Sequence, residues 1–181
     1  MKAVLALLLI GTTFVIAASA SAATPEAKAT YDASNSKAAA DYKLASTHCD
    51  GLAGNPKDIC VAQAKAARVQ VEADATAQYK GTVSARSSAR KDIADANYNV
   101  DKAKCAGQAN NGKDVCLKQA KATMIAAKSD ATADKKIMDA RTDARDDKQT
   151  ANYKVAVEKC DALAGSGKDA CVASAKTKYG Q

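Results

Sequence analysis

The chain has 181 residues and is rich in alanine, with 44 Ala against six Tyr, one Phe, one His and no Trp. These counts exclude a large aromatic core, a β-sandwich or barrel, and a histidine-based metal or catalytic centre, because each lacks its usual residues. Lys and Arg outnumber Asp and Glu by 27 to 20, so the formal net charge is +7. The composition predicts an all-α protein of one or two small domains.

The first 22 residues have the pattern of a cleaved secretory signal peptide. A short basic start, Met1-Lys2, precedes an apolar run over residues 3–18, and small residues follow in the sequence Ala18-Ser19-Ala20-Ser21-Ala22. The alternative is a retained membrane anchor, but the run is shorter than the ~20 residues that a span needs. We therefore expect a periplasmic protein, or else an extracellular one, with no transmembrane anchor after cleavage. Residues 23–36 are expected to be frayed.

One sequence unit occurs three times within residues 37–181, which we take as a helical repeat domain. Each copy contains a tyrosine, a cysteine seven residues later, a second cysteine eleven residues after the first, and then Ala-Lys, in the pattern Y-x6-C-x10-C-x3-A-K. The copies occupy about residues 40–66, 96–122 and 151–177, with a period of 56 and then 55 residues. Such regular spacing indicates one structural unit used three times.

The residues between the two cysteines of each unit predict a helix, a tight turn and a second helix. In the first copy Gly54 suits a left-handed helix end, Asn55 a helix N-cap, Pro56 the first helical position and Asp58 the N3 position of a capping box. The corresponding residues of the other copies are Asn110, Asn111, Gly112 and Asp114, and then Gly165, Ser166, Gly167 and Asp169. The two cysteines of a unit then lie level across an antiparallel helix pair.

Six cysteines allow fifteen pairings, but this symmetry favours three local disulfides. These are Cys49 to Cys60, Cys105 to Cys116, and Cys160 to Cys171. Each would contribute on the order of 3 kcal/mol by the loop-entropy argument, and an exported chain is where such bonds persist. We therefore predict an antiparallel, elongated helical bundle of three disulfide-stapled helix-turn-helix repeats.

The segments between these turns, residues 57–107 and 113–163, contain no proline and could each form one long helix. The motif Asp-Ala-Thr-Ala recurs at an offset of 56 residues, whereas the Ala-Arg block at 85–90 recurs at an offset of 55. One residue has therefore been gained or lost between them, and residues 81–84 are the expected weak point of the first segment. Continuous segments give an elongated, coiled-coil-like molecule, which we favour; two broken segments give a compact bundle of about six helices.

No set of residues predicts catalysis, and we expect neither an enzyme nor a cofactor. The cysteines could be redox switches or metal ligands, but the C-x10-C spacing lacks the C-x-x-C arrangement of such sites. His48 beside Cys49 could add a metal ligand, yet Lys104 and Lys159 replace it in the other copies, which favours a surface histidine. Structural disulfides and no metal site are therefore predicted.

Basic residues offer the one candidate binding surface. Arg86 with Arg90, and Arg141 with Arg145, form i, i+4 pairs, while Lys57, Lys113 and Lys168 lie beside the expected helix N-termini. They could bind envelope polyanions. Neighbouring aspartates partly neutralise their positive charge, so the alternative is an ordinary solvated charged face. Nucleic acid is not expected, because few aromatic side chains are available for base stacking.

The repeat unit after a secretory signal resembles small periplasmic proteins of proteobacteria that carry Y-x6-C-x10-C-x3-A-K units and are often called TolA-like or cell-envelope proteins. The resemblance covers residues 40–181 and implies an all-helical periplasmic protein without a catalytic residue. We expect a structural or interaction protein of the cell envelope, acting as a spacer or adaptor toward polyanions or periplasmic proteins. The alternatives are a stress-related, holdase-like binder and a metal- or redox-responsive protein; the oligomeric state is left open.

Overall fold

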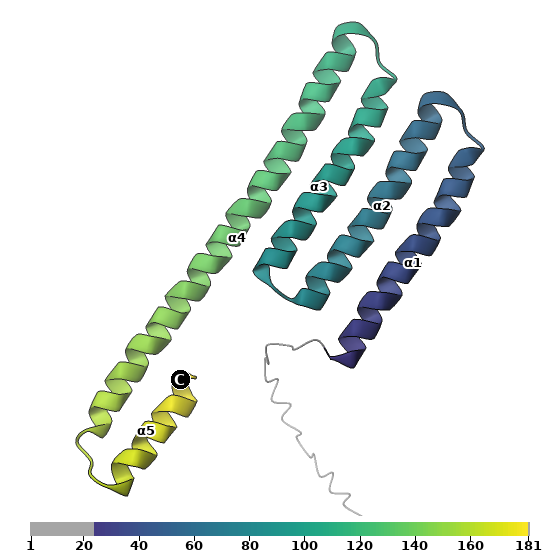
Figure 1. Ribbon diagram of the computed structural model, residues 1–181. Helices are drawn as coiled ribbons and strands as arrows, with labels where there is room; N and C mark the ends of the chain where they lie inside the picture. The colour runs from purple at the N-terminus through teal and green to yellow at the C-terminus, as the bar shows by residue number, and fades with distance from the viewer. Residues whose placement is uncertain (1–23, 181) are drawn as a thin grey trace, which may run out of the picture.

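The computed structural model describes residues 24–180, and within them the chain forms five α-helices and no strand (Figure 1). The helices are α1 (Pro25–Asp50), α2 (Gly54–Lys80), α3 (Val83–Ala106), α4 (Asn110–Cys160) and α5 (Ser166–Tyr179). The prediction of an all-α fold is therefore confirmed. The signal-peptide prediction for residues 1–22 lies outside the described residues.

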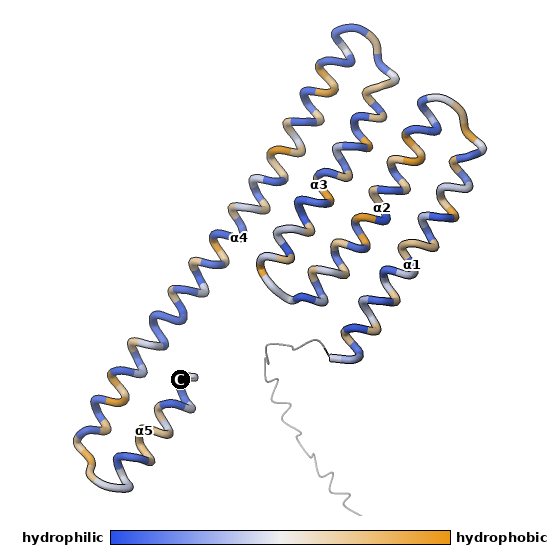
Figure 2. The backbone as a smooth tube through the Cα atoms, viewed as in Figure 1, coloured by the Kyte–Doolittle hydropathy of each residue, from blue (hydrophilic) through white to orange (hydrophobic). Residues whose placement is uncertain are grey.

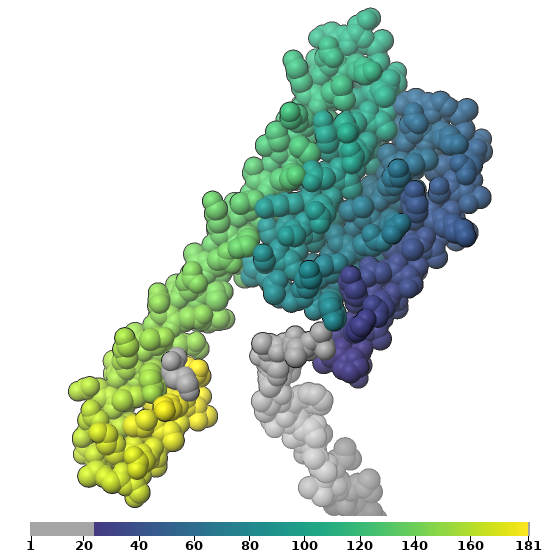
Figure 3. Space-filling model, viewed as in Figure 1, coloured from purple at the N-terminus to yellow at the C-terminus, as the bar shows by residue number. Residues whose placement is uncertain are grey.

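The helices form a single antiparallel row. Within the described residues, each helix contacts only the helices that precede and follow it in the chain. Helices α1, α2, α3 and the first half of α4 lie side by side, and α4 then continues past the α2–α3 turn (Figure 1). Helix α5 folds back on the second half of α4, so that this hairpin projects from the four-helix part of the molecule (Figure 3).

The three turns that follow the first cysteines have the predicted left-handed residue. Gly54, Asn110 and Gly165 have φ values of +60°, +50° and +57°, a region that glycine and asparagine adopt at least cost. The predicted side-chain caps are wrong: Gly54 and Asn110 already begin their helices, Gly165 is itself the cap of α5, and none of these three helices has a side-chain cap. The Asn55 amide instead donates to the Ala103 carbonyl oxygen at 2.7 Å.

The two long segments behave differently, so neither of the two predicted alternatives holds for both. The first breaks at the expected place, where Gly81 has a φ of +62° and the Thr82 hydroxyl accepts from the Ala85 amide to cap α3. The second forms the 51-residue helix α4, about 77 Å long at 1.5 Å per residue. The extra residue in the first segment thus belongs to a chain reversal that the second segment lacks.

The N-terminal part of α1 corrects the expectation that residues 23–36 fray. The helix begins at Pro25, and the Thr24 hydroxyl caps it by accepting from the Ala27 amide at 3.1 Å. Backbone hydrogen bonding at this helix start, and then the Thr24 side chain, lower the pKa of Glu26. The Tyr31 ring stacks on the Tyr79 ring of α2, with centroids 4.9 Å apart. A capped end and an aromatic contact explain the order that composition alone did not predict.

The interior consists of small side chains. Among the described residues, the buried ones are alanines, the first cysteine of each pair, Val100 and Ser87. Apolar and polar residues alternate along every helix (Figure 2). No described helix is both long and apolar enough to cross a membrane. Alanine buries little area and so little hydrophobic free energy, which leaves the disulfides and helix propensity a large share of the stability.

Candidate functional site

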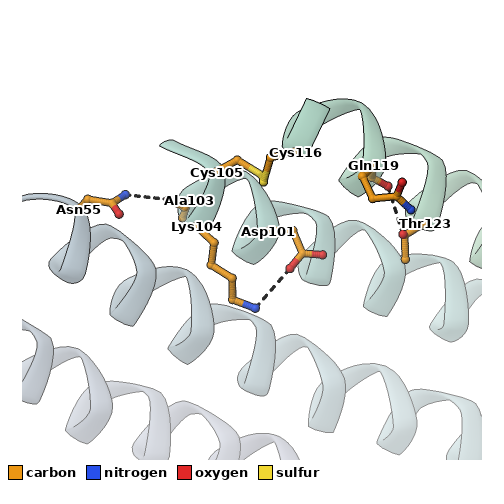
Figure 4. The surroundings of a disulfide bond; sticks show 8 residues. All are labelled: Asn55, Asp101, Ala103, Lys104, Cys105, Cys116, Gln119 and Thr123. Atoms are coloured by element: carbon orange, nitrogen blue, oxygen red, sulfur yellow. Dashed lines mark hydrogen bonds and ion pairs between the residues drawn. A yellow bond between two sulfur atoms is a disulfide. The ribbon is translucent and has the colours of Figure 1, made fainter. Parts of the chain in front are cut away.

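The three predicted disulfides are confirmed. Cys49–Cys60, Cys105–Cys116 and Cys160–Cys171 have Cα–Cα separations of 5.6, 5.6 and 5.7 Å, within the usual range. The first cysteine of each pair is at most 1% exposed. Each bond ties the last turn of one helix to the beginning of the next, as Figure 4 shows for Cys105 and Cys116. Three disulfides indicate that the chain matures in an oxidising, exported environment.

Two of the three lysines that follow the turns form ion pairs across their helical hairpins. Lys57 pairs with Asp50 at 3.1 Å, and Lys168 pairs with Asp161 at 2.8 Å. In the middle hairpin Ala106 stands where the other two have an aspartate, and no ion pair of Lys113 is formed within the described residues. The prediction that all three lysines bind anions at helix N-termini thus remains untested, and two of them have intramolecular partners.

The four predicted arginines do not form one cluster. Arg90 of α3 pairs with Asp134 of α4, and Arg86 donates to the Gly81 carbonyl oxygen at 3.3 Å. The Ser87 hydroxyl donates to the Ala131 carbonyl oxygen, so α3 begins level with that part of α4. Arg141 and Arg145 follow in the part of α4 that extends beyond α3.

A second basic group lies where α5 meets α4. Arg141, Arg145 and Lys148 of α4 and Lys178 of α5 line one shallow hollow, together with Gln149 and Tyr179. Arg145 pairs with its neighbour Asp146 at 3.2 Å, and Lys178 lies over the Tyr179 ring. Sequence reasoning missed both lysines. The i, i+3 spacing of Arg145 and Lys148 was a usable signal, but the contribution of Lys178 depends on the fold.

An open groove of about 1240 Å³ runs along one face of α2 and α3. Its floor contains Val61, Val69 and Ala73 of α2 with Ala89 and Ala96 of α3. Charged side chains of both signs surround that floor: Lys57, Asp58, Lys65, Arg68, Glu72, Lys80, Asp92 and Asp95. The groove therefore combines an apolar floor with a charged rim of mixed sign.

Metal-binding side chains do not converge in the part of the chain that the structure describes. No group of three or more His, Cys, Asp or Glu side chains there is arranged to hold a metal ion, and all six cysteines are paired. His48 is exposed in the last turn of α1.

Comparison with known proteins found no matching family model, no similar curated protein and no similar solved structure.

Proposed function

We propose that the protein is a non-enzymatic spacer or adaptor of the bacterial cell envelope, located in the periplasm. The observation that carries this proposal is the uninterrupted helix α4, which has 51 residues. It separates the disulfide-bonded turn near residue 110 from the one near residue 165 by about 75 Å. A helix clamped by a disulfide at each end is suited to holding two contact surfaces at a fixed distance.

The resemblance to periplasmic Cys-pair repeat proteins, the excess of basic over acidic residues and the basic hollow between α4 and α5 support an envelope partner of negative charge. The hollow lies where the C-terminal end of α5 meets α4, outside the four-helix part of the molecule (Figure 1), so a polyanion bound there would leave the four-helix part free for another partner. Electrostatic attraction of this kind is screened by salt.

Cosedimentation with isolated envelope fragments tests this proposal. We expect binding at low salt, loss of binding at high salt, and weaker binding by the variant Arg141→Gln/Arg145→Gln/Lys178→Gln. The matched control, Lys28→Gln/Lys37→Gln/Lys43→Gln on α1, removes the same charge elsewhere and should bind as the wild type does. Absence of binding at low salt, or equal loss in both variants, would contradict a docking role for this hollow.

The groove along α2 and α3 favours a second candidate function, a holdase-like binder of apolar segments. Val69 contributes to its floor and is accessible from it. In this case the protein would suppress aggregation of an unfolded client, the effect would survive high salt, and Val69→Lys would abolish it. Salt-resistant suppression that is insensitive to Val69→Lys would count against the groove as the client site.

A further inference from the structure

One side of α4 has no partner along almost its whole length. Its contacts with α3 and α5 involve buried residues such as Ala120, Ala131 and Cys160. On an α-helix with 100° per residue these three lie on one side. The opposite side carries exposed residues at intervals of three and four: Ala122, Ile125, Ser129, Ala133, Lys136, Ala140, Ala144, Lys148, Ala151 and Val155. We call this set the α4 stripe.

The internal repeat shows how the residues equivalent to the α4 stripe pack in the first copy. Its first half corresponds to the side of α2 that packs on α3: Ser129 and Ala133 are equivalent to Ala73 and Ala77. In the first copy Ala73 and Ala77 are buried against Ala89 of α3, with Ile93 beside them. The first half of the stripe is thus an α2-like surface that lacks the α3-like helix against which α2 packs.

The second half of the stripe corresponds to α3. Ala144, Ala151 and Val155 are equivalent to Ala89, Ala96 and Val100. These three residues of α3 are 5%, 9% and 8% exposed, whereas Val155 is 55% exposed, and Ala144 and Ala151 are also exposed. The second half is therefore an α3-like surface that lacks the α2-like helix against which α3 packs.

Burial elsewhere in the repeats supports this equivalence. Ala64 and Ala75 of α2 correspond to Ala120 and Ala131 of α4, and all four are buried. These positions face the preceding helix of the hairpin, which is present in both copies. At these two pairs of positions, where the packing partner is present in both copies, the two copies agree in burial.

The continuity of α4 joins the two surfaces into one. In the first copy Gly81 and Thr82 reverse the chain between α2 and α3, so the two sides face each other. In α4 the segment 134–139 is one residue shorter and has no glycine, and the helix continues through it. The two complementary sides then lie end to end along a single side of one helix and cannot meet within one chain.

We propose that the α4 stripe is the interface for a second copy of this chain, packed antiparallel. The α2-like half of one copy then meets the α3-like half of the other, and a two-fold axis repeats the contact. The register follows from α2 and α3: since Ala73 packs near Ala89, Ser129 of one copy lies opposite Ala144 of the other. The midpoint of that pair places Ile137, which is 50% exposed, beside the axis.

Apart from Lys136 and Lys148, whose long side chains can carry their ammonium groups to solvent at the edge of the pair, the side chains suit such a close helix pair. Ala133, Ala140, Ala144 and Ala151 allow the approach that alanines give α2 and α3, and Ile125, Ile137 and Val155 supply apolar area. Asp130 and Arg141 flank the stripe on one side, and neither forms an ion pair within the described residues. In the antiparallel register each faces the other in the second copy, which gives two symmetric charge pairs at the edge of the stripe. Arg141 also lines the basic hollow, whose Arg145 and Lys178 lie outside the stripe and remain available to a polyanion in the dimer.

Sedimentation equilibrium of the oxidised protein, with charge substitutions in the stripe, tests the interface. We expect a reversible dimer, and Ala133→Glu/Ala140→Glu should raise its dissociation constant by at least about tenfold, because the longer side chains hold the two helices apart and four carboxylates would be buried beside only two Lys136 ammonium groups. Both sites are exposed in the monomer, so its circular dichroism should not change. Ala39→Glu/Ala40→Glu, at exposed sites of α1, is the matched control. A monomer at all concentrations, or a dimer indifferent to the stripe variant, would overturn the proposal.

Cross-linking tests the register. Because the native cysteines are paired, Ile137→Cys provides one free thiol, and a short bismaleimide should link two copies through it. Ile125→Cys should not link to itself, since its two copies lie roughly 35 Å apart in this register, but it should link to Lys148→Cys in a mixture. Self-linking of Ile125→Cys would contradict the antiparallel arrangement. The envelope proposal rests on the length of α4 within one chain and would survive either failure.

Discussion

Gly81 is the residue at which two equivalent segments of the repeat take different courses. Its φ of +62° is open to glycine and costs other residues about 1–2 kcal/mol, whereas an added Cβ there would meet no atom within 4 Å. Gly81→Ala is therefore expected to destabilise the protein by about 1 kcal/mol through backbone strain alone. Gly167→Ala is the control, because Gly167 is helical with a negative φ and open surroundings. Thermal unfolding of both variants checks this, and equal melting temperatures would contradict it.

Asn55 and Gly107 lie in contact, and a double-mutant cycle can test whether their contributions to stability are coupled. The Asn55 amide donates to the Ala103 carbonyl oxygen (Figure 4), and a Cβ on Gly107 would lie 2.7 Å from the Asn55 Oδ1 atom. Asn55→Ala should cost about 1 kcal/mol, and Gly107→Ala should displace the same amide at a similar cost. In a double-mutant cycle by urea denaturation, Gly107→Ala should cost nothing further in the Asn55→Ala background. Fully additive costs would show that the two residues act independently.

At the scale of the helical elements, the terminal helices should differ in how much they depend on their disulfide: α5 should need it to stay folded, and α1 should not. Helix α5 has 14 residues and, among the described helices, packs on α4 alone. Isolated helices of this length are marginal in water. Cys160→Ser/Cys171→Ser should therefore release α5, seen as loss of hydrogen-exchange protection in residues 166–179, while α1 to α3 stay protected.

Cys49→Ser/Cys60→Ser is the comparison for that experiment. It should cost about 3 kcal/mol by the loop-entropy argument, yet α1 should remain protected, because it packs along the 27 residues of α2 and stacks Tyr31 on Tyr79. Equal loss of protection in α1 and α5 would contradict the difference in packing.

The sequence predicted the hairpins well because their determinants are local. Left-handed residues at 54, 110 and 165 and cysteines level across each turn follow from spacing. The break near Gly81 followed from a single change of repeat offset. Two features escaped sequence reasoning for the same physical reason: the Asn55 contact with Ala103 and the position of Lys178 beside Arg141 and Arg145 join residues far apart in the chain. The start of α1 at Pro25 depends on a cap and on the distant Tyr79.

At the scale of the whole molecule, one small segment decides between an extended and a folded-back shape. Replacing Ile137 by a Gly-Thr pair restores to α4 the reversal that Gly81 and Thr82 give the first copy. The second half of α4 should then fold onto its first half, pack the stripe within one chain, and yield a monomer with a smaller radius of gyration by X-ray scattering. An unchanged radius would mean that the repeat-equivalent sides of α4 do not recognise each other.

The central claim is that α4 remains straight and holds the two terminal hairpins apart. Lys113 and Lys168 lie just beyond the turns at its two ends, so a donor and an acceptor dye at these positions, on chains diluted into unlabelled protein, report the distance within one chain. A straight α4 predicts a separation of roughly 75 Å and almost no energy transfer. Efficient transfer, from a separation near the ~20 Å of two helix spacings, would mean that α4 folds back and would contradict both the spacer and the exposed stripe.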